Sequence, residues 1–346
     1  MKTNAYAAFQ ENGKIGPFQI ERRTMGRRDV QLEIDYCGVC HTDLHFVNND
    51  WGMTHYPVVP GHEIVGRISA VGKEVDGFKV GQLAAVGCMI DSCGNCHSCE
   101  SDLEQYCFRG FVGTYNYPTA DPGGVTYGGY SKRIVCKEDF ILSIPENLKV
   151  EGTAPLLCAG ITSYSPLKHW GVGPQRKVGI IGLGGLGHMG VKFSHAFGAY
   201  TVMITTSPEK GEDAQKLGAD EILISTDVRA MARQSGQFDF ILNTIPVNHS
   251  FEPYLNLLKI NGVMCVVGAP EVFRINASQL VFGRKSLTGS LIGGIAETQE
   301  MLNFCGERDI VSDVELIRMD EINEAYDRLI KSDVKYRFVI DMNSLN

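Results

Sequence analysis

The sequence predicts an α/β protein with two domains, a β-rich domain and a doubly wound parallel sheet. The chain has 346 residues, of which 44% are hydrophobic, so it can bury more than one core. Short β patterns and glycine turns run from Met1 to about Pro155, and strand patterns alternate with helix patterns from about Leu156 to Phe282. Such alternation is typical of a parallel sheet with helices on both faces.

The predicted boundaries follow these patterns. Residues 1–155 form the β-rich domain and contain both candidate metal sites apart from one ligand at position 158, and residues 156–282 form the parallel sheet. Residues 283–346 contain the end of that sheet and a final strand in DVKYRFVIDM. The chain shows no internal repeat.

Composition excludes several classes of function. The formal net charge of −8 argues against nucleic acid as a partner, because phosphate binding requires a concentrated basic surface. The N-terminal residues lack a signal-peptide pattern, and no stretch offers about 18 uninterrupted apolar residues, so we expect a cytoplasmic protein without a membrane partner. Eleven cysteines, an odd number, make a disulfide framework improbable and leave metal binding or catalysis.

Four of these cysteines lie within the polar, turn-rich segment DSCGNCHSCESDLEQYC. Their spacing, C-x2-C-x2-C-x7-C, allows one loop to wrap four thiolates around a structural zinc ion. The ligands would be Cys93, Cys96, Cys99 and Cys107. An iron–sulfur cluster is the alternative, but the ferredoxin pattern continues x3-C-P after the third cysteine. Unrelated buried thiols fit poorly with the polar residues between them.

Three scattered residues, Cys40, His62 and Cys158, would make a second zinc site with an open fourth position for substrate. Each could instead be a core residue, and spacing alone does not join them. Their sequence context does: Thr42 and Asp43 follow Cys40, and Glu63 follows His62. Polar groups beside ligands are what a metal site needs to orient them.

A glycine turn between a predicted strand and a predicted helix indicates a dinucleotide site. The strand is Val178–Ile181, the turn reads G-x-G-x-x-G, and further strands are expected at 200–205, 238–243 and 263–267. The turn comprises Gly182, Gly184, Gly185, Leu186 and Gly187. Its glycines allow close approach to a pyrophosphate at a helix N-terminus, so we expect a Rossmann unit.

The end of the second strand favours NADP over NAD. An acidic residue would hold the ribose hydroxyls of NAD at this place, but the sequence reads ITTSPEK. The candidate phosphate ligands are Thr205, Thr206, Ser207 and Lys210, which offer hydroxyl groups and one positive charge. Glu209 is the exception, since it could face the ribose.

The motif G-H-E-x-x-G-x5-G-x2-V at Gly61 to Val75 resembles the signature of the zinc-containing medium-chain alcohol dehydrogenases. CGVCHTDLH, PLLCAGITSYSPL and GSLIGGIAETQEML are similar to the cinnamyl-alcohol-dehydrogenase group and its bacterial NADPH-dependent aldehyde reductases. The resemblance covers essentially the whole chain. It implies a GroES-like catalytic domain, to which the last segment returns, and a Rossmann cofactor domain. Two zinc ions and NADP(H) are the implied cofactors.

The resemblance also implies roles for individual residues. Cys40, His62 and Cys158 would bind the catalytic zinc, Glu63 could exchange with the water ligand, and Asp43 would orient His62. An aldehyde would bind the open position, be polarised by the ion and receive hydride from NADPH. Thr42 would pass a proton through the cofactor ribose to His45. Motifs that approach the cofactor in this family contain His41, Thr162 and Ser290.

Two rivals remain on the same fold: a non-catalytic nucleotide-binding or sensor protein, and a zinc-free quinone reductase. Both would lack the open-site ligands or the cysteine lobe, which this sequence retains. Plant cinnamyl enzymes carry tryptophan where this chain has Gly113, so we expect broad aldehyde reduction. SLTGSLI at 286–292 suggests an edge strand that pairs in a homodimer, although an internal strand would look the same.

Overall fold

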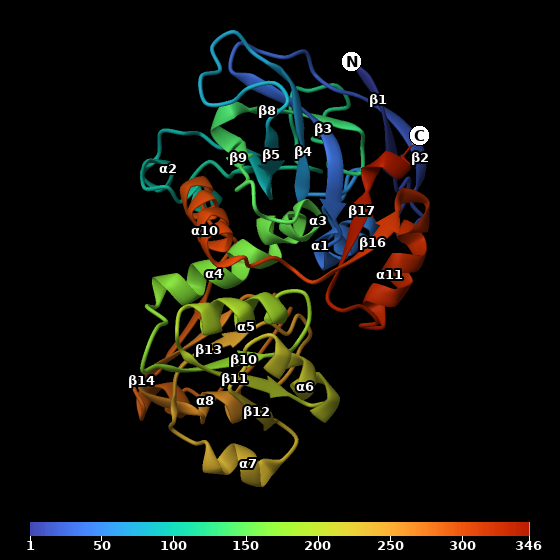
Figure 1. Ribbon diagram of the computed structural model, residues 1–346. Coiled ribbons are helices and arrows are strands. Elements are labelled where there is room, and N and C mark those ends of the chain that lie inside the picture. The colour runs from blue at the N-terminus through green and yellow to red at the C-terminus, as the bar shows by residue number, and fades with distance from the viewer. Residues whose placement is uncertain (346) are drawn as a thin grey trace. The chain divides into compact units, whose positions relative to one another are not determined.

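The computed structural model describes residues 1–345, which fold as two compact units. The first unit contains the chain up to Cys158 and resumes at Gly293, and the second is Ala159–Ile292. In Figure 1 the first unit is therefore coloured blue to green and again red, because its last strands are contributed by the C-terminal part of the chain.

The first unit is built on a mainly antiparallel sheet with the strand order β16-β17-β3-β4-β5-β9, and β8 also pairs with β3. These strands are β3 (Asp29–Gly38), β4 (Ile64–Val71), β5 (Leu83–Val86), β8 (Arg133–Lys137), β9 (Leu142–Ser143), β16 (Val314–Arg318) and β17 (Arg337–Asp341). The red β17 lies beside the blue β3 (Figure 1), which confirms the final strand predicted from DVKYRFVIDM. Strand β3, from the N-terminal part of the chain, therefore pairs with β17 from the C-terminal part.

Smaller elements complete this unit. They are the strand pairs β1 (Lys2–Ala7) with β2 (Gly16–Glu21) and β6 (Met89–Asp91) with β7 (Val112–Gly113), the helices α1 (His41–Asn48), α2 (His97–Glu100), α3 (Val150–Thr153), α10 (Ile295–Arg308) and α11 (Ile322–Ile330), and the 3-10 turns Glu104–Tyr106, Glu138–Phe140, Ala154–Leu157, Met319–Glu321 and Met342–Ser344. Helix α1 begins directly after Cys40, whose backbone N–H donates to the Asp43 carboxylate at 2.9 Å. This reciprocal cap fixes the start of the helix.

The second unit is an all-parallel sheet with the order β12-β11-β10-β13-β14-β15. Its strands are β10 (Lys177–Ile181), β11 (Tyr200–Thr205), β12 (Glu221–Ile224), β13 (Phe238–Asn243), β14 (Leu258–Val266) and β15 (Ser286–Gly289), and its helices are α4 (Ala159–His169), α5 (Gly187–Ala196), α6 (Pro208–Lys216), α7 (Val228–Arg233), α8 (Glu252–Leu255) and α9 (Ser278–Val281). The predicted doubly wound sheet is confirmed. Its strand order reverses between β10 and β13, where such sheets bind ligands at the carboxyl ends of their strands.

Two details differ from the sequence expectations. Strand β14 begins at Leu258, before the predicted start at 263, because Leu258 already pairs with Phe238 ahead of a register shift. Strand β15 lies at the edge of the sheet within this chain, so the alternative of an internal strand does not hold for the described residues.

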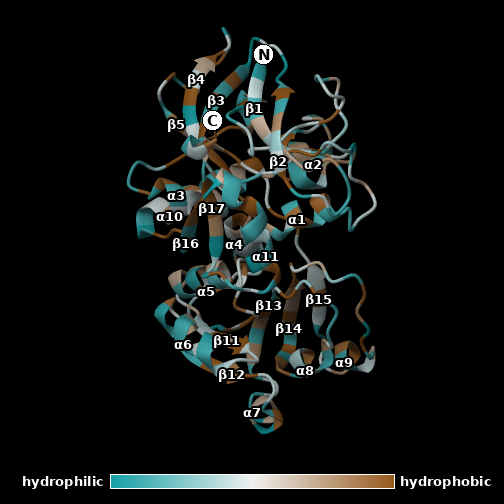
Figure 2. Ribbon diagram, turned by 90° about the vertical axis from the view of Figure 1, so that its right-hand side faces the viewer, coloured by the Kyte–Doolittle hydropathy of each residue, from teal (hydrophilic) through white to brown (hydrophobic). Residues whose placement is uncertain are grey.

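Apolar side chains concentrate between the sheet of the second unit and its helices. Phe238, Phe251 and Met264 are fully buried there. Strands β13 and β14 are brown in Figure 2, whereas the outer helix α6 is teal, as expected for a helix that exposes one face. Along residues 1–345, no helix is both long and apolar enough to cross a bilayer.

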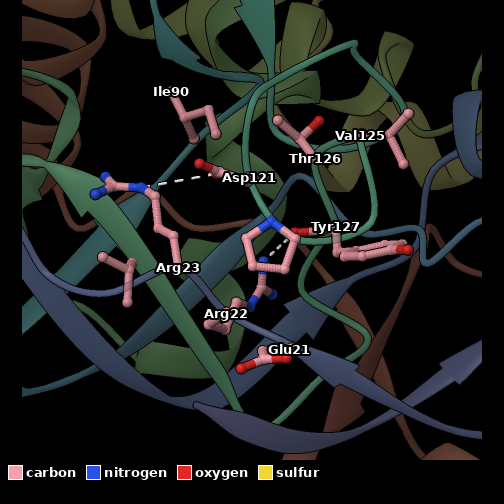
Figure 3. A pocket seen from close by; sticks show the side chains of 10 residues that line it. Glu21, Arg22, Arg23, Ile90, Asp121, Val125, Thr126 and Tyr127 are labelled. Carbon is pink, nitrogen blue, oxygen red and sulfur yellow. Dashed lines mark hydrogen bonds and ion pairs between the residues drawn. The ribbon is translucent and has the colours of Figure 1, made fainter.

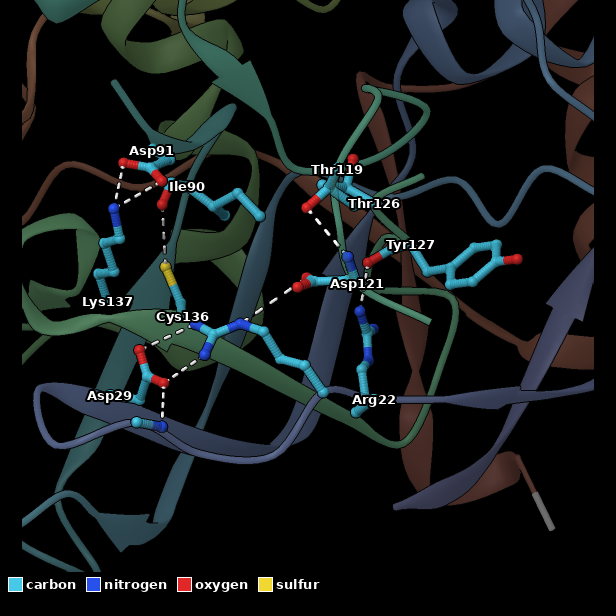
Figure 4. A network of polar contacts seen from close by, with 12 residues as sticks. Arg22, Asp29, Ile90, Asp91, Thr119, Asp121, Thr126, Tyr127, Cys136 and Lys137 are labelled. Atoms are coloured by element: carbon cyan, nitrogen blue, oxygen red, sulfur yellow. Dashed lines mark hydrogen bonds and ion pairs between the residues drawn. The ribbon is translucent and has the colours of Figure 1, made fainter. Parts of the chain in front are cut away.

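Arg22 is a buried cation that ties β2 to the segment 127–133 of the first unit (Figure 4). Its guanidinium donates to the carbonyl oxygens of Tyr127 at 2.6 Å, Gly128 at 2.9 Å and Arg133 at 2.8 Å, and to Ser131 Oγ at 2.8 Å. Burial lowers the pKa of Arg22 to about 10, so the group remains charged at neutral pH. The charge is spread over four oxygen acceptors in place of water.

A small cavity beside Arg22 is drawn in Figure 3. The neighbouring Arg23 is directed toward Asp121, 3.7 Å away, and also pairs with Asp29. The cavity holds about 20 Å³, which is room for about one water molecule. It is therefore a packing feature and no substrate site.

Replacing Arg22 with alanine should lower the free energy of unfolding of the first unit by about 3 kcal/mol or more. The Tyr127 carbonyl oxygen then loses its donor, and those of Gly128 and Arg133 are left to share the one hydroxyl of Ser131. Urea titration followed by Trp51 fluorescence in a Trp170→Phe background reports on this unit. Arg27→Ala is the control, since the exposed Arg27–Glu74 pair should contribute less than about 1 kcal/mol. Equal unfolding midpoints for the two variants would contradict the role of Arg22.

Candidate active site

The four predicted lobe cysteines converge on one point in the first unit. Their sulfur atoms all lie within 4.8 Å of one another, with Cys93 to Cys99 at 3.9 Å and Cys96 to Cys99 at 3.5 Å. Sulfur atoms on a tetrahedral zinc ion are separated by about 3.8 Å, given the Zn–S bond length. No disulfide joins them, so the donor set fits a closed zinc site.

Backbone N–H groups in the lobe form hydrogen bonds to the cysteine sulfur atoms and favour their thiolate form. The short helix α2 begins after Cys96, and the backbone N–H groups of Cys99 and Phe108 lower the pKa of the Cys96 thiol to about 6. Cys93 N–H also donates to Cys107 Sγ at 3.5 Å. Backbone donors that stabilise thiolates before metal arrives are expected around structural zinc.

The scattered candidates form a second group, called here the ligand cluster: Cys40, His62, Glu63 and Cys158. Cys40 precedes α1, His62 and Glu63 precede β4, and Cys158 follows a 3-10 turn. Cys40 Sγ lies 3.9 Å from Cys158 Sγ, again the edge length expected for tetrahedral zinc. All four candidate ligand atoms lie within 4.8 Å of one another.

Asp43 sets the orientation of His62. Its Oδ1 accepts from His62 Nδ1 at 3.2 Å and from Gly61 N–H at 3.1 Å, and its side chain is fully buried. With Nδ1 bound to a carboxylate, the other ring nitrogen, Nε2, is free for a metal. That Nε2 atom is buried without a hydrogen-bond partner, which is the state expected of a ligand atom.

Glu63 is held by a buried cation that the sequence analysis did not identify. Arg337, on β17, donates to Glu63 Oε1 and to the carbonyl oxygen of Val39 at 2.7 Å. Burial raises the pKa of Glu63 to about 7, against the opposing charge of Arg337. Glu63 Oε2 has no hydrogen-bond partner, so one carboxylate oxygen is paired and the other is available.

The two thiols of the ligand cluster differ in acidity. The hydrogen bond from Cys158 lowers the pKa of Cys40 well below its usual range, with His62 and Arg337 also favouring the thiolate. The pKa of Cys158 is raised well above its usual range by the hydrogen bonds to Cys40 and Cys88 and by burial. A second thiolate therefore requires a nearby cation, and the donor set fits zinc.

The predicted proton-relay residues lie on α1. Thr42 is half-buried in its first turn, His41 is exposed, and His45 lies one turn further. His45 Nδ1 lies 2.6 Å from Asp50 Oδ2, and the His45 ring is tilted against the Trp51 ring, with the centroids 5.1 Å apart. Asp50 thus fixes the orientation of the imidazole, a partner that the sequence analysis did not identify.

The glycine turn of the second unit has the geometry of a phosphate cradle. Gly182 has φ +88°, which favours glycine, and a side chain at Gly187 would collide with the carbonyl oxygen of Gly182. Around Gly184 there is open space, so the backbone can be approached closely by a ligand. Gly185 and Leu186 complete the turn before α5 begins at Gly187. The turn therefore fits a pyrophosphate.

The other cofactor candidates of this unit gather at the same carboxyl edge. Gly182 N–H donates to Ile204 O at 3.1 Å, so the turn lies beside the end of β11, where Thr205 is buried and Thr206 is exposed. Ser207 caps α6, and Lys210 is exposed in its first turn. Thr162 is buried in α4, and Ser290 follows β15, where its N–H donates to Val266 O at 3.3 Å.

The residues that contact the ligand cluster could not be identified from the sequence, because their contacts are made only by folding. Arg337 opens a strand in which the next three residues are apolar, and a charge beside such a buried run indicates a buried counter-charge. The sequence does not say which one. Cys88, which contacts Cys158, and Tyr130, which contacts Asp43, carry no comparable signal.

Comparison with known proteins gives consistent matches. Residues 26–146 match the alcohol dehydrogenase GroES-like domain, and residues 185–307 match the zinc-binding dehydrogenase family. Aldehyde reductase YahK of Escherichia coli (strain K12) is 51% identical, with 100% of this chain and 99% of that protein covered.

Two solved structures are similar to this chain over its whole length. A cinnamyl alcohol dehydrogenase from Sorghum bicolor has a TM-score of 0.96 at 42% identity, covering 100% of this chain and 99% of that one. The cinnamyl alcohol dehydrogenase of Helicobacter pylori, complexed with NADP(H), has a TM-score of 0.93 at 37% identity, with 100% and 99% covered.

Zinc should bind the ligand cluster less tightly as the pH falls. Burial lowers the pKa of His62, but Asp43 and its hydrogen bonds raise it well above its usual value, and the pKa of Cys158 is also raised. Without metal, His62 and Cys158 are both protonated at neutral pH, so zinc binding releases protons. The affinity for zinc therefore falls roughly 10- to 100-fold for each unit by which the pH is lowered. Chelator competition at pH 6, 7 and 8 measures this. An affinity of the ligand cluster for zinc that stays constant from pH 6 to pH 8 would contradict the prediction.

Proposed function

The chain belongs to the zinc-binding dehydrogenases with an alcohol dehydrogenase GroES-like domain, and we propose that it interconverts aldehydes and primary alcohols with NADP(H). The observation that carries this proposal is the convergence of Cys40, His62 and Cys158, three zinc-type ligands from distant segments, at one buried point. Three protein ligands leave a coordination position for substrate. The zinc-binding family match and the preserved cluster give no support to a non-catalytic or zinc-free rival.

The two cofactors supply Lewis-acid polarisation of the carbonyl and a hydride, respectively. The protein supplies the geometry. Asp43 keeps Nε2 of His62 directed at the metal position, and Arg337 keeps one oxygen of Glu63 paired. In this proposal Glu63 can approach the metal position with its free oxygen when a ligand exchanges, and its pairing with Arg337 keeps it out of that position otherwise.

Proton transfer is assigned to α1. We propose that the Thr42 hydroxyl bonds the substrate oxygen and that His45 exchanges the proton with solvent. Two features support this role for His45: its Nδ1 lies 2.6 Å from Asp50, which leaves Nε2 for the relay, and the ring is partly exposed. His41, at the start of the same helix, is proposed to contact the cofactor pyrophosphate.

The cofactor contacts are proposed at the carboxyl edge of the second unit. The glycine turn would hold the pyrophosphate, and the hydroxyl groups of Thr205, Thr206 and Ser207 with Lys210 would hold the 2′-phosphate. Thr162 and Ser290 are proposed to lie near the nicotinamide. Glu209 is the carboxylate of this loop and lies exposed in the first turn of α6.

A broad aldehyde range is supported by the surroundings of Gly113. A side chain at this position would collide with the ring of Tyr117, which packs over the glycine and against Phe111 at 5.5 Å. The tryptophan of plant cinnamyl enzymes could not occupy this place unless Tyr117 moved. We therefore propose that the chain lacks a dedicated aromatic subsite here and accepts aliphatic as well as aromatic aldehydes.

We also propose a cytoplasmic homodimer. The reduced cysteines fit the cytoplasm. The edge strand β15 and the exposed apolar side chains of Val281 and Phe282 just before it support pairing of two copies along this edge.

Replacing Cys158 with serine should abolish aldehyde reduction, a loss of at least about 10³-fold, while NADPH still binds, because the change removes a zinc ligand from the first unit only. Turnover measures the loss of activity, NADPH fluorescence measures cofactor binding, and zinc content per chain measures the loss of the metal ion. Cys265→Ala is the control, since this thiol is buried in β14 of the other unit and should leave two zinc ions and activity in place. Undiminished turnover in the serine variant would remove the proposed function.

Reversing the charge of Lys210 should raise the KM for NADPH by about tenfold or more and leave the KM for NADH nearly unchanged, because only NADPH carries the 2′-phosphate. The matched control is Lys216→Glu, which makes the same charge change in the last turn of the same helix. Equal effects of the two substitutions, or an equal loss with both cofactors, would show that Lys210 does not contact the phosphate.

A further inference from the structure

We propose that Tyr130 and Tyr326 are positioning residues for the catalytic zinc: their hydroxyl groups form a chain of donors that holds Asp43, and Asp43 in turn holds His62. The inference rests on the proposed function, because it concerns the zinc ion which that function requires. Neither tyrosine belongs to the ligand cluster or to the relay on α1.

Two hydrogen bonds link Tyr326 to Tyr130 and Tyr130 to Asp43. The Tyr326 hydroxyl donates to the Tyr130 hydroxyl at 3.4 Å, and the Tyr130 hydroxyl donates to Asp43 Oδ2 at 3.3 Å. On the other carboxylate oxygen, Asp43 Oδ1 accepts from His62 Nδ1 at 3.2 Å. One carboxylate therefore links the two hydroxyl groups to a zinc ligand.

The backbone around Tyr130 is shaped to bring this ring close to His62. Tyr130 N–H donates to Pro60 O at 2.9 Å, and Gly129 N–H donates to Gly61 O at 2.8 Å. Gly61 has φ +102°, and a Cβ at this position would lie 2.8 Å from Tyr130 Cδ1. The glycine next to His62 thus leaves the space that the tyrosine ring occupies.

Tyr326 connects the chain of donors to a helix from the C-terminal part of the sequence. It lies on the buried face of α11 with Ile322, Ala325 and Leu329, and 5% of its surface is exposed. Burial raises the pKa of both tyrosines well above the usual value, so both hydroxyl groups keep their protons and remain donors. Packing of α11 therefore fixes the last donor of the chain.

The contribution of Tyr130 follows from the bonds that Asp43 would retain without it. Oδ2 accepts from Tyr130 and from Cys40 N–H, whereas Oδ1 accepts from Gly61 N–H and His62. Without the Tyr130 hydroxyl, Oδ2 keeps the bond from Cys40 N–H, and the interaction of Asp43 with Tyr115 remains. One donor fewer then holds the carboxylate in the orientation that binds His62. Loss of a partner that orients a metal ligand typically weakens metal binding by 10- to 100-fold.

The test is the rate at which the catalytic zinc passes to a colorimetric chelator, with the four-cysteine lobe as an internal control in the same molecule. Tyr130→Phe should speed release roughly tenfold. Tyr326→Phe should speed it by about threefold, because Tyr130 still donates to Asp43. In the double variant Tyr326→Phe should add nothing, since it acts only through the Tyr130 hydroxyl.

Tyr56→Phe is the matched control. It also removes a tyrosine hydroxyl bonded to α1, through Val47 O at 2.8 Å, but lies outside the donor chain, so zinc release should stay at the wild-type rate. Wild-type release in Tyr130→Phe, equal acceleration at both zinc sites, or independent multiplication of the two effects would each overturn the inference. If wild-type protein holds one zinc per chain, the proposed function itself fails. If Tyr130→Phe does not fold, the pair Tyr326→Phe and Tyr56→Phe still decides.

Discussion

The first unit depends on the balance of negative charge at the buried ligand cluster. Two thiolates, Cys40 and Cys158, and two carboxylates, Asp43 and Glu63, can be negative there. Among the described residues, the guanidinium of Arg337 and the protonated ring of His62 provide the positive charge against them, and His62 loses its charge when it binds a metal. Buried charge of one sign is not tolerated without a partner. A divalent cation removes most of the excess, which explains why the metal-free cluster keeps a proton on Cys158.

Sheet pairing brings these charges together. Strand β3 pairs with β4 on one side and with β17 on the other, so the ends of three strands meet where the chain turns into α1. Glu63 immediately precedes β4, Arg337 opens β17, and Cys40 caps the helix. The register of β3 therefore decides whether an ion can be held at all, and a slip of one residue would turn the charged side chains away from each other.

The sequence predicted those features whose residues lie close together along the chain. The cysteine lobe and the glycine turn are each complete within about 15 residues, so spacing and the order of strand and helix were enough. Cys40, His62 and Cys158 were joined only through a resemblance to a family, because their proximity is created by folding. Arg337 and the tyrosine hydroxyl groups stayed unidentified, since each reveals its role only through a contact made across the sheet.

The discontinuous course of the first unit bears on how the protein is made. During synthesis, β3, β4 and the glutamate beside them leave the ribosome long before β17 exists, whereas the second unit is one continuous stretch that can fold as it emerges. Until β17 is translated, the nascent chain lacks the guanidinium of Arg337 that pairs with Glu63. A complete metal site therefore requires β17, and a product that lacks this strand would fold its nucleotide-binding unit without the cation that pairs with Glu63.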